Sequence, residues 1–194
     1  MIDQFIQYLQ QLAPLSGEEQ EYLRQHLPIR FFKKGAHLLK QDELSRAFYF
    51  NLKGCVRMYH LVDGEEKTTF FYEEHQFISS YESFIKQKPA THYLQCIEDC
   101  QLVVISQEHA QALLVQFPRF EFLARVMMET ELAMYQHMLA TFITLNPEQR
   151  YLKMMKEQNA LFQRIPQYYM ATYLGVKAES LSRIKKRIAQ RKLS

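Results

Sequence analysis

Residues 166–186 read PQYYMATYLGVKAESLSRIKK, which is the pattern of two short helices joined by a tight turn. Pro166 suits the start of the first helix, which we expect to run to Leu174. Gly175 then interrupts it, because glycine readily adopts the positive φ that ends a helix. A second helix is expected to begin near Ala178. This stretch therefore predicts a helix-turn-helix.

The side chains of this motif divide into an inner and an outer set. Ala171 is small enough for two helices to cross closely, and four apolar residues are placed to fill the core between them: Met170, Leu174, Leu181 and Ile184. The outward positions of the second helix hold short or polar groups, namely Lys177, Ala178, Glu179, Ser180, Arg183 and Lys186. Arginine can donate paired hydrogen bonds to guanine, and glutamate can accept from cytosine. We therefore predict DNA contact, with a plain helical hairpin as the alternative.

Positive charge is concentrated in the same part of the chain. Residues 146–194 hold eleven basic and three acidic residues, a net of +8, whereas residues 1–145 hold thirteen and eighteen, a net of −5. A basic segment on an acidic body favours a polyanionic partner, although a solvated basic helix is the plain alternative. Binding should weaken with salt if a cluster of basic residues lies near phosphates, namely Lys185, Lys186, Arg187, Arg191 and Lys192.

The region upstream has the pattern of short antiparallel strands. Seven β-rich runs occupy residues 29–32, 37–39, 47–52, 56–61, 68–72, 92–97 and 102–105. Turn residues separate them, and Asp63-Gly64 is the strongest hairpin signal. This spacing predicts an antiparallel sandwich or barrel. Helices are expected on both sides of it, one starting near Gly17 through the capping pair Ser16 and Glu19, and one capped by Ser106.

A long helix is predicted over residues 119–145, about 40 Å in length. Its apolar positions recur at three- and four-residue steps: Phe120, Leu123, Val126, Met127, Met134, Met138 and Phe142. Such a stripe favours a dimer seam, with packing against the barrel as the alternative. Asn146-Pro147-Glu148 then predicts the start of another helix. We expect three parts: helices and barrel (1–117), the long helix (118–145) and the helix-turn-helix domain (146–194).

Several classes of protein are disfavoured by the composition and motifs. The 194 residues contain no run of about 18 apolar residues and no secretory signal pattern, so we expect no membrane segment and a cytoplasmic protein. Three cysteines (Cys55, Cys96 and Cys100) cannot all pair, which suits a reducing compartment. Cys96 and Cys100 are expected to be structural thiols, with a redox pair as the alternative. No His-x-His or hydrolase motif occurs, so we expect neither a metal site nor an enzyme.

The chain as a whole resembles the Crp/Fnr family of bacterial transcription regulators over about residues 5–190. The likeness rests on FKKG at 32–35, FYFNLKGCVR at 48–57, DGE at 63–65 and LGVKAESLSRI at 174–184. The resemblance implies an α+β fold: a jelly-roll-like antiparallel β-roll sensor domain of the cyclic-nucleotide-binding type, a long dimerisation helix and a C-terminal winged helix-turn-helix. It also implies double-stranded DNA and a second copy as partners, with RNA polymerase as a further candidate.

The same resemblance assigns roles to single residues. Glu179 and Arg183 would read bases, with Lys177, Ala178 and Ser180 on the same edge, and Gln167 would contact a phosphate. Because the family often has a long polar residue where this chain has Ala178, its DNA site should differ from the best-known one. The wing is expected to be short or absent, since the sequence stops at Ser194, and this should weaken backbone contacts.

The predicted sensor domain departs from the family's cyclic-nucleotide sensors. Those carry Gly-Glu-Leu and, about ten residues later, Arg-Ser/Thr-Ala, whose Glu and Arg bind the ribose and the cyclic phosphate. Here the Glu position is Ser80 and the Arg position is Ala90, so the effector pocket of Ser79, Ser80, Ala90 and Thr91 is degenerate. We therefore expect neither cAMP nor cGMP as effector and no cofactor, while the identity of any other effector stays open, including an apolar one in the interior of the roll. An iron–sulfur cluster is also not expected, since the first cysteine is Cys55. The alternative function is a small-molecule-binding or protein-interaction module with weakened or lost DNA binding.

Overall fold

The structure is a computed structural model that describes residues 1–191. Two helices open the chain, α1 (Ile2–Leu12) and α2 (Gly17–His26). The predicted capping box begins α2: the Glu19 N–H donates to Ser16 Oγ (3.2 Å), and the Ser16 N–H donates to the Glu19 carboxylate (2.7 Å). These bonds satisfy backbone donors that a helix start leaves open.

Within the described residues, eight strands form two antiparallel four-stranded sheets that make up a β-roll. One sheet has the order β1 (Ile29–Phe32), β8 (Cys100–Ser106), β3 (Ala47–Lys53) and β6 (Phe77–Ile78). The other has the order β2 (His37–Leu39), β7 (Tyr93–Cys96), β4 (Val56–Val62) and β5 (Glu65–Tyr72). The short helix α3 (Tyr81–Lys86) follows β6. The predicted antiparallel roll is therefore confirmed, whereas β6 and α3 were not anticipated.

Two glycine-containing turns hold the strands at close range. Asp63 (φ 54°) and Gly64 (φ 78°) form the two-residue turn between β4 and β5, so pairing begins at Glu65, three residues earlier than predicted. Gly54 has φ +99°, and a Cβ there would lie 2.7 Å from both the Asp99 carbonyl oxygen and Cys100 Sγ. Any residue with a Cβ at this position would have a strained backbone and would clash with these two atoms.

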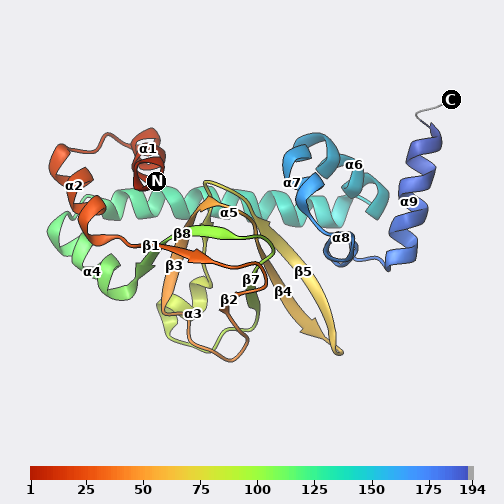
Figure 1. Ribbon diagram of the computed structural model, residues 1–194, viewed down its shortest axis with the longest axis horizontal. Helices are drawn as coiled ribbons and strands as arrows, with labels where there is room; N and C mark the ends of the chain where they lie inside the picture. Colours follow the sequence, from red (N-terminus) through yellow and green to blue (C-terminus); the bar gives the residue numbers. More distant parts are fainter. Residues whose placement is uncertain (192–194) are drawn as a thin grey trace.

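A long helix extends along one side of the roll. Ser106 caps α4 (Gln107–Gln116) as predicted, and α5 (Phe120–Thr144) follows with 25 residues, a length of about 38 Å. Figure 1 shows α5 running through the molecule, with α1, α2 and α4 at one end, the roll against its middle and the C-terminal helices at the other end.

Most of the apolar stripe of α5 that the sequence suggested as a dimer seam packs inward within the chain. Phe120 and Leu123 are buried in a core with α1 and α2, and Met127 packs on the same core. Met134 and Met138 pack against the core of the roll. Phe142 of the predicted stripe remains exposed, together with a second set of apolar side chains: Phe122, Met128, Leu132, Leu139 and Ile143. The alternative, packing against the roll, is thus correct for most of the predicted stripe.

Four helices complete the described chain: α6 (Pro147–Glu157), α7 (Asn159–Arg164), α8 (Gln167–Leu174) and α9 (Ala178–Arg191). Asn146 caps α6, with Pro147 in its first turn, as predicted. Only α7 was not anticipated. The wing concerns the chain beyond α9, so that prediction and the one for Lys192 lie outside the described residues.

Candidate nucleic-acid interface and sensor cavities

The predicted helix-turn-helix is formed by α8 and α9. Gly175 ends α8 in the left-handed conformation (φ 69°), and the Val176 N–H donates to the Ala171 carbonyl at 3.0 Å. The predicted inner residues are all buried, namely Met170, Ala171, Leu174, Leu181 and Ile184. Their burial fixes which side of α9 faces outward.

The outward side of α9 carries the residues proposed to read DNA. Lys177, Ala178, Glu179, Arg183 and Lys186 are exposed, and Ser180 is half-buried. The Arg183 guanidinium donates to Ser180 Oγ at 3.1 Å. Gln167 is exposed at the start of α8, where its side-chain oxygen accepts from Lys185 Nζ at 3.0 Å. The structure therefore brings this set together at the end of the molecule farthest from α1 and α2 (Figure 1).

Two arginines expected near phosphates have a structural partner. Arg187 pairs with the Glu148 carboxylate, and Arg191 Nη1 lies 2.8 Å from the same group. Glu148 belongs to α6, so these pairs join the second half of α9 to that helix. Glu148 therefore partly neutralises the charge of both arginines. The exposed lysines of α9 among the described residues are Lys185 and Lys186.

Arg150 connects the end of α5 to the helix-turn-helix. Its guanidinium donates to the carbonyls of Phe142 (3.0 Å), Leu145 (2.8 Å) and Leu174 (2.8 Å). The first two carbonyls lie at the end of α5, and the third lies at the end of α8. Since the last carbonyls of a helix have no partner within it, one cation here satisfies the ends of two helices.

The helix-turn-helix also rests on the roll. The Arg57 guanidinium of β4 lies between the rings of Tyr59 (4.0 Å) and Tyr169 (3.8 Å), the second of which belongs to α8. Arg57 is 1% exposed, and its charge is met by Glu66 at 2.5 Å. Thr172 of α8 donates to Thr68 of β5 at 2.8 Å. Burial on both faces makes this cation–π contact stronger than it would be in water.

A second arginine joins the same two parts. Arg164 of α7 donates to both oxygens of Glu74 (2.8 Å each) and to the Glu98 carboxylate (2.6 Å). Burial alone would raise the pKa of Glu74, but the hydrogen bonds from Arg164 and the Gly54 N–H hold that pKa below its ordinary value. These long-range contacts set the orientation of α8 and α9 relative to the roll.

A cavity of about 280 Å³ lies between the roll and α5, and we call it the roll cavity. Its lining includes Ser79, Tyr81, His92 and Glu131 but, among the described residues, no lysine or arginine. Burial raises the pKa of Glu131 to about 7. Burial, and then the charge of His60, lowers the pKa of His92 to about 4. The charged group available to a ligand here is therefore a carboxyl rather than a cation.

Of the four residues predicted to mark the effector pocket, Ser79 lines this cavity. Ser80 and Ala90 are buried outside its lining, and Thr91 is exposed. Glu131 was not identified from the sequence, although a signal existed: it lies four residues after Met127 and three before Met134, in the stripe that packs inward. A carboxylate within the buried apolar stripe of a helix is unusual and can be recognised from the sequence.

Comparison with known proteins supports the fold. Residues 29–117 match the family model of the cyclic nucleotide-binding domain. Comparison with curated protein sequences finds no significant match. No helix of the described residues combines the length and apolar character needed to cross a membrane.

Three solved structures are similar over most of their length. One is a protein assigned to the Crp/Fnr family of transcriptional regulators from Eubacterium rectale (15% identity, 95% of this chain and 88% of that chain, TM-score 0.74). Another is FixK2 from Bradyrhizobium japonicum (15%, 85% and 85%, 0.71). The third is CLP from Xanthomonas campestris, described as a c-di-GMP-responsive global regulator (16%, 92% and 94%, 0.69). The resemblance to Crp/Fnr regulators is thereby confirmed for the fold.

Proposed function

We propose that this chain, which has the fold of the Crp/Fnr regulators, is a sequence-specific DNA-binding transcriptional regulator rather than an enzyme. The observation that carries the proposal is the outward face of α9, where Glu179 and Arg183 are exposed one turn apart on a helix whose opposite face is buried. A helix presented in this way can enter a major groove and reach base edges. Gln167 and the lysines of α9 would contact phosphates.

The proposed active form is a dimer paired through α5. The exposed apolar side chains Met128, Leu132, Leu139 and Phe142 follow one another at steps of four, seven and three residues. This is the heptad spacing with which two helices pair side by side. A dimer would present two recognition helices about 34 Å apart, which matches successive turns of the major groove. RNA polymerase is retained as a candidate partner.

We further propose that cAMP and cGMP are not its effectors. A cyclic phosphate is bound strongly where a guanidinium forms a charge-assisted pair with it. Ala90 stands at the sequence position of the family's arginine, and Glu131 adds an acidic group to the lining of the roll cavity. An anionic ligand would therefore meet repulsion rather than a partner.

Selection of bound duplexes from a random DNA pool, at two salt concentrations and without effector, tests the function. Enrichment of a two-fold-symmetric site is expected, and its loss at high salt should be steep. Arg183→Ala should cost about 1–3 kcal/mol of binding and relax the preference at one base pair. The matched control is Lys86→Ala, which removes an exposed cation of α3.

Two results would contradict this proposal. If Arg183→Ala binds every duplex as the parent does, the assignment of base reading is wrong. If only salt-sensitive, sequence-independent retention is seen, the protein without effector is not a sequence-specific regulator. That second result would favour the alternative of a small-molecule-binding or protein-interaction module.

A further inference from the structure

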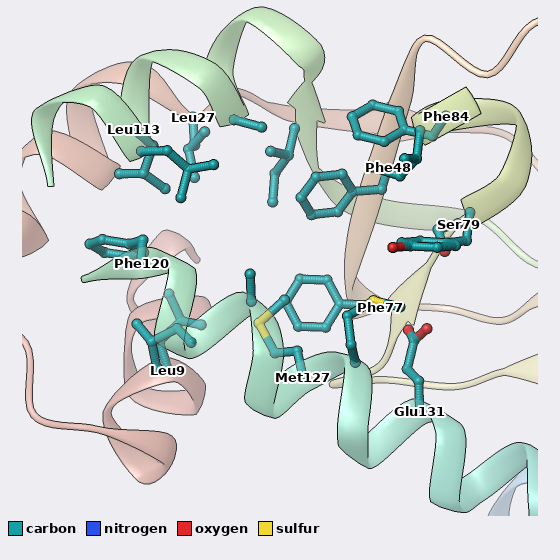
Figure 2. Close-up of a pocket in the computed structure, with 18 of the residues that line it drawn as sticks. Leu9, Leu27, Phe48, Phe77, Ser79, Phe84, Leu113, Phe120, Met127 and Glu131 are labelled. Carbon is teal, nitrogen blue, oxygen red and sulfur yellow. The ribbon is translucent and has the colours of Figure 1, made fainter. Parts of the chain in front are cut away.

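A second cavity, which Glu131 also lines, lies among α1, α3, α4, α5 and the strands of the roll. It has a volume of about 290 Å³, and we call it the apolar cavity. Its walls are almost entirely hydrocarbon and include five phenylalanines: Phe5, Phe48, Phe77, Phe84 and Phe120. Figure 2 shows rings and aliphatic side chains turned toward a common space. At about 30 Å³ for each water-sized volume, it holds roughly ten non-hydrogen atoms.

Few polar groups line this cavity. The polar lining residues are Ser79, Tyr81 and Glu131, and in Figure 2 the Glu131 carboxylate points from α5 toward Ser79. No lysine, arginine or histidine is among the lining residues that the structure describes. Within the described part of the chain, the Glu131 carboxylate has no hydrogen bond or ion pair. The cavity therefore combines apolar walls with a single acidic group that has no cation beside it.

This combination selects among ligands by charge. Burial penalises the ionised Glu131 carboxyl, and an ammonium placed against it would relieve that penalty while the two hydroxyls accept its remaining hydrogens. A carboxylate or phosphate would face repulsion and find no cation. An uncharged molecule would gain from the apolar walls but would leave the acid unpaired.

We propose that the apolar cavity binds an organic cation, an aryl-alkyl primary amine of about ten non-hydrogen atoms, with its ammonium against Glu131 and its ring among the phenylalanines. The site shares Ser79, Tyr81, Met128 and Glu131 with the roll cavity, but its body-binding walls are different and include side chains of α1, α4 and the first half of α5. The inference goes beyond the proposed DNA binding and does not depend on it. Because Ala124, Met127 and Glu131 of α5 line the cavity, an occupant would contact the helix that leads to the DNA-binding end.

The test is calorimetric titration of the full chain, without DNA, at pH 8 with three matched probes. These are 4-phenylbutylamine, 4-phenylbutan-1-ol and 4-phenylbutyrate, which share a body and differ in charge. We expect the amine to bind at least about tenfold more tightly than the alcohol, and the acid to bind most weakly. Glu131→Gln should remove the preference for the amine while keeping the affinity for the alcohol. Glu129→Gln, an exposed position on the same helix, should leave both unchanged.

A second pair of variants tests the location. Ala124 lines the cavity yet is exposed, so Ala124→Trp should fill the space without disturbing a core. It is expected to abolish binding of both the amine and the alcohol. Ala133→Trp, an exposed position that lines neither cavity, should bind as the parent does.

Three results would overturn the proposal. The acid could bind as tightly as the amine, Glu131→Gln could leave the preference for the amine intact, or the folded parent could bind none of the three probes. If a second copy of the chain fills the cavity, the folded parent will bind none of the probes at high protein concentration. In that case, probe binding is lost as the protein concentration rises. Because no DNA is present, failure here is distinct from failure of the proposed regulator function.

Discussion

Replacing Glu131 with glutamine should stabilise the protein in a pH-dependent way. Burial raises the pKa of Glu131 from its ordinary 4.5 to about 7. The folded state therefore holds this proton more tightly than the unfolded state, and the stability it contributes is full below pH 4.5 and is lost as the pH rises to about 7. At about 1.4 kcal/mol per pH unit, the ionised carboxyl costs about 3 kcal/mol above that range.

Glutamine has the same shape and does not titrate, so it escapes this cost. Relative to the parent, Glu131→Gln should gain about 3 kcal/mol of unfolding free energy at pH 8 but less than about 1 kcal/mol at pH 5. The other titratable groups around Glu131 do not change charge in this range. The pKa values of Tyr8, Tyr72 and Tyr135 are raised by burial, and that of His92 is lowered to about 4.

Chemical denaturation at both pH values measures the difference directly. The control is Glu129→Gln, which removes an exposed carboxylate one half-turn away and its surface pair with Arg125. That variant should change stability by less than about 1 kcal/mol at either pH. If the gain of Glu131→Gln is the same at pH 5 and pH 8, the carboxyl does not titrate as its burial implies and the reasoning is refuted.

Three further perturbations have definite expected outcomes. Gly175→Ala should cost about 1–2 kcal/mol of unfolding free energy, because this position has φ 69°. The control Gly17→Ala, at an ordinary φ, should be close to neutral. Equal effects of the two variants in thermal denaturation would contradict this expectation. Arg164→Met leaves the half-buried carboxylates of Glu74 and Glu98 without their cation and should lower the unfolding free energy by about 2–4 kcal/mol. Amide hydrogen exchange in α7 should become faster, and an unchanged exchange rate would count against the contact. Leu132→Asp should make the protein monomeric in sedimentation without unfolding it, while Ala133→Asp should stay dimeric; a dimer in both variants would exclude the proposed seam.

Helix caps and turn residues, whose effects extend over only a few residues, correctly predicted where several helices and a turn begin. The capping boxes at Ser16 and Ser106 and the Asn146-Pro147 start each place a helix end where the structure has it. Asp63-Gly64 makes the expected turn because both residues adopt positive φ. In each case the hydrogen bonds or dihedral angles that decide the outcome lie inside the segment itself.

Short elements that depend on distant partners were not predicted. β6 has only two residues, and it exists because Phe77 and Ile78 pair with Phe50 and Tyr49 of β3. α7 holds six residues, too few for a periodic pattern, and Arg164 fastens it to the roll. Propensity carries little information over such lengths, since tertiary packing supplies most of their stability.

The sequence by itself determined the antiparallel roll, the long helix, the helix-turn-helix and the residues that α9 turns outward, because strand alternation, helical period and turn residues are local properties. Only the tertiary structure decided which apolar stripe of α5 is buried, since that helix is apolar on more than one side and burial depends on what packs against it. The same applies to Glu131, whose altered acidity comes from surroundings supplied by other elements. It applies also to Arg57, whose two aromatic partners lie in different parts of the chain.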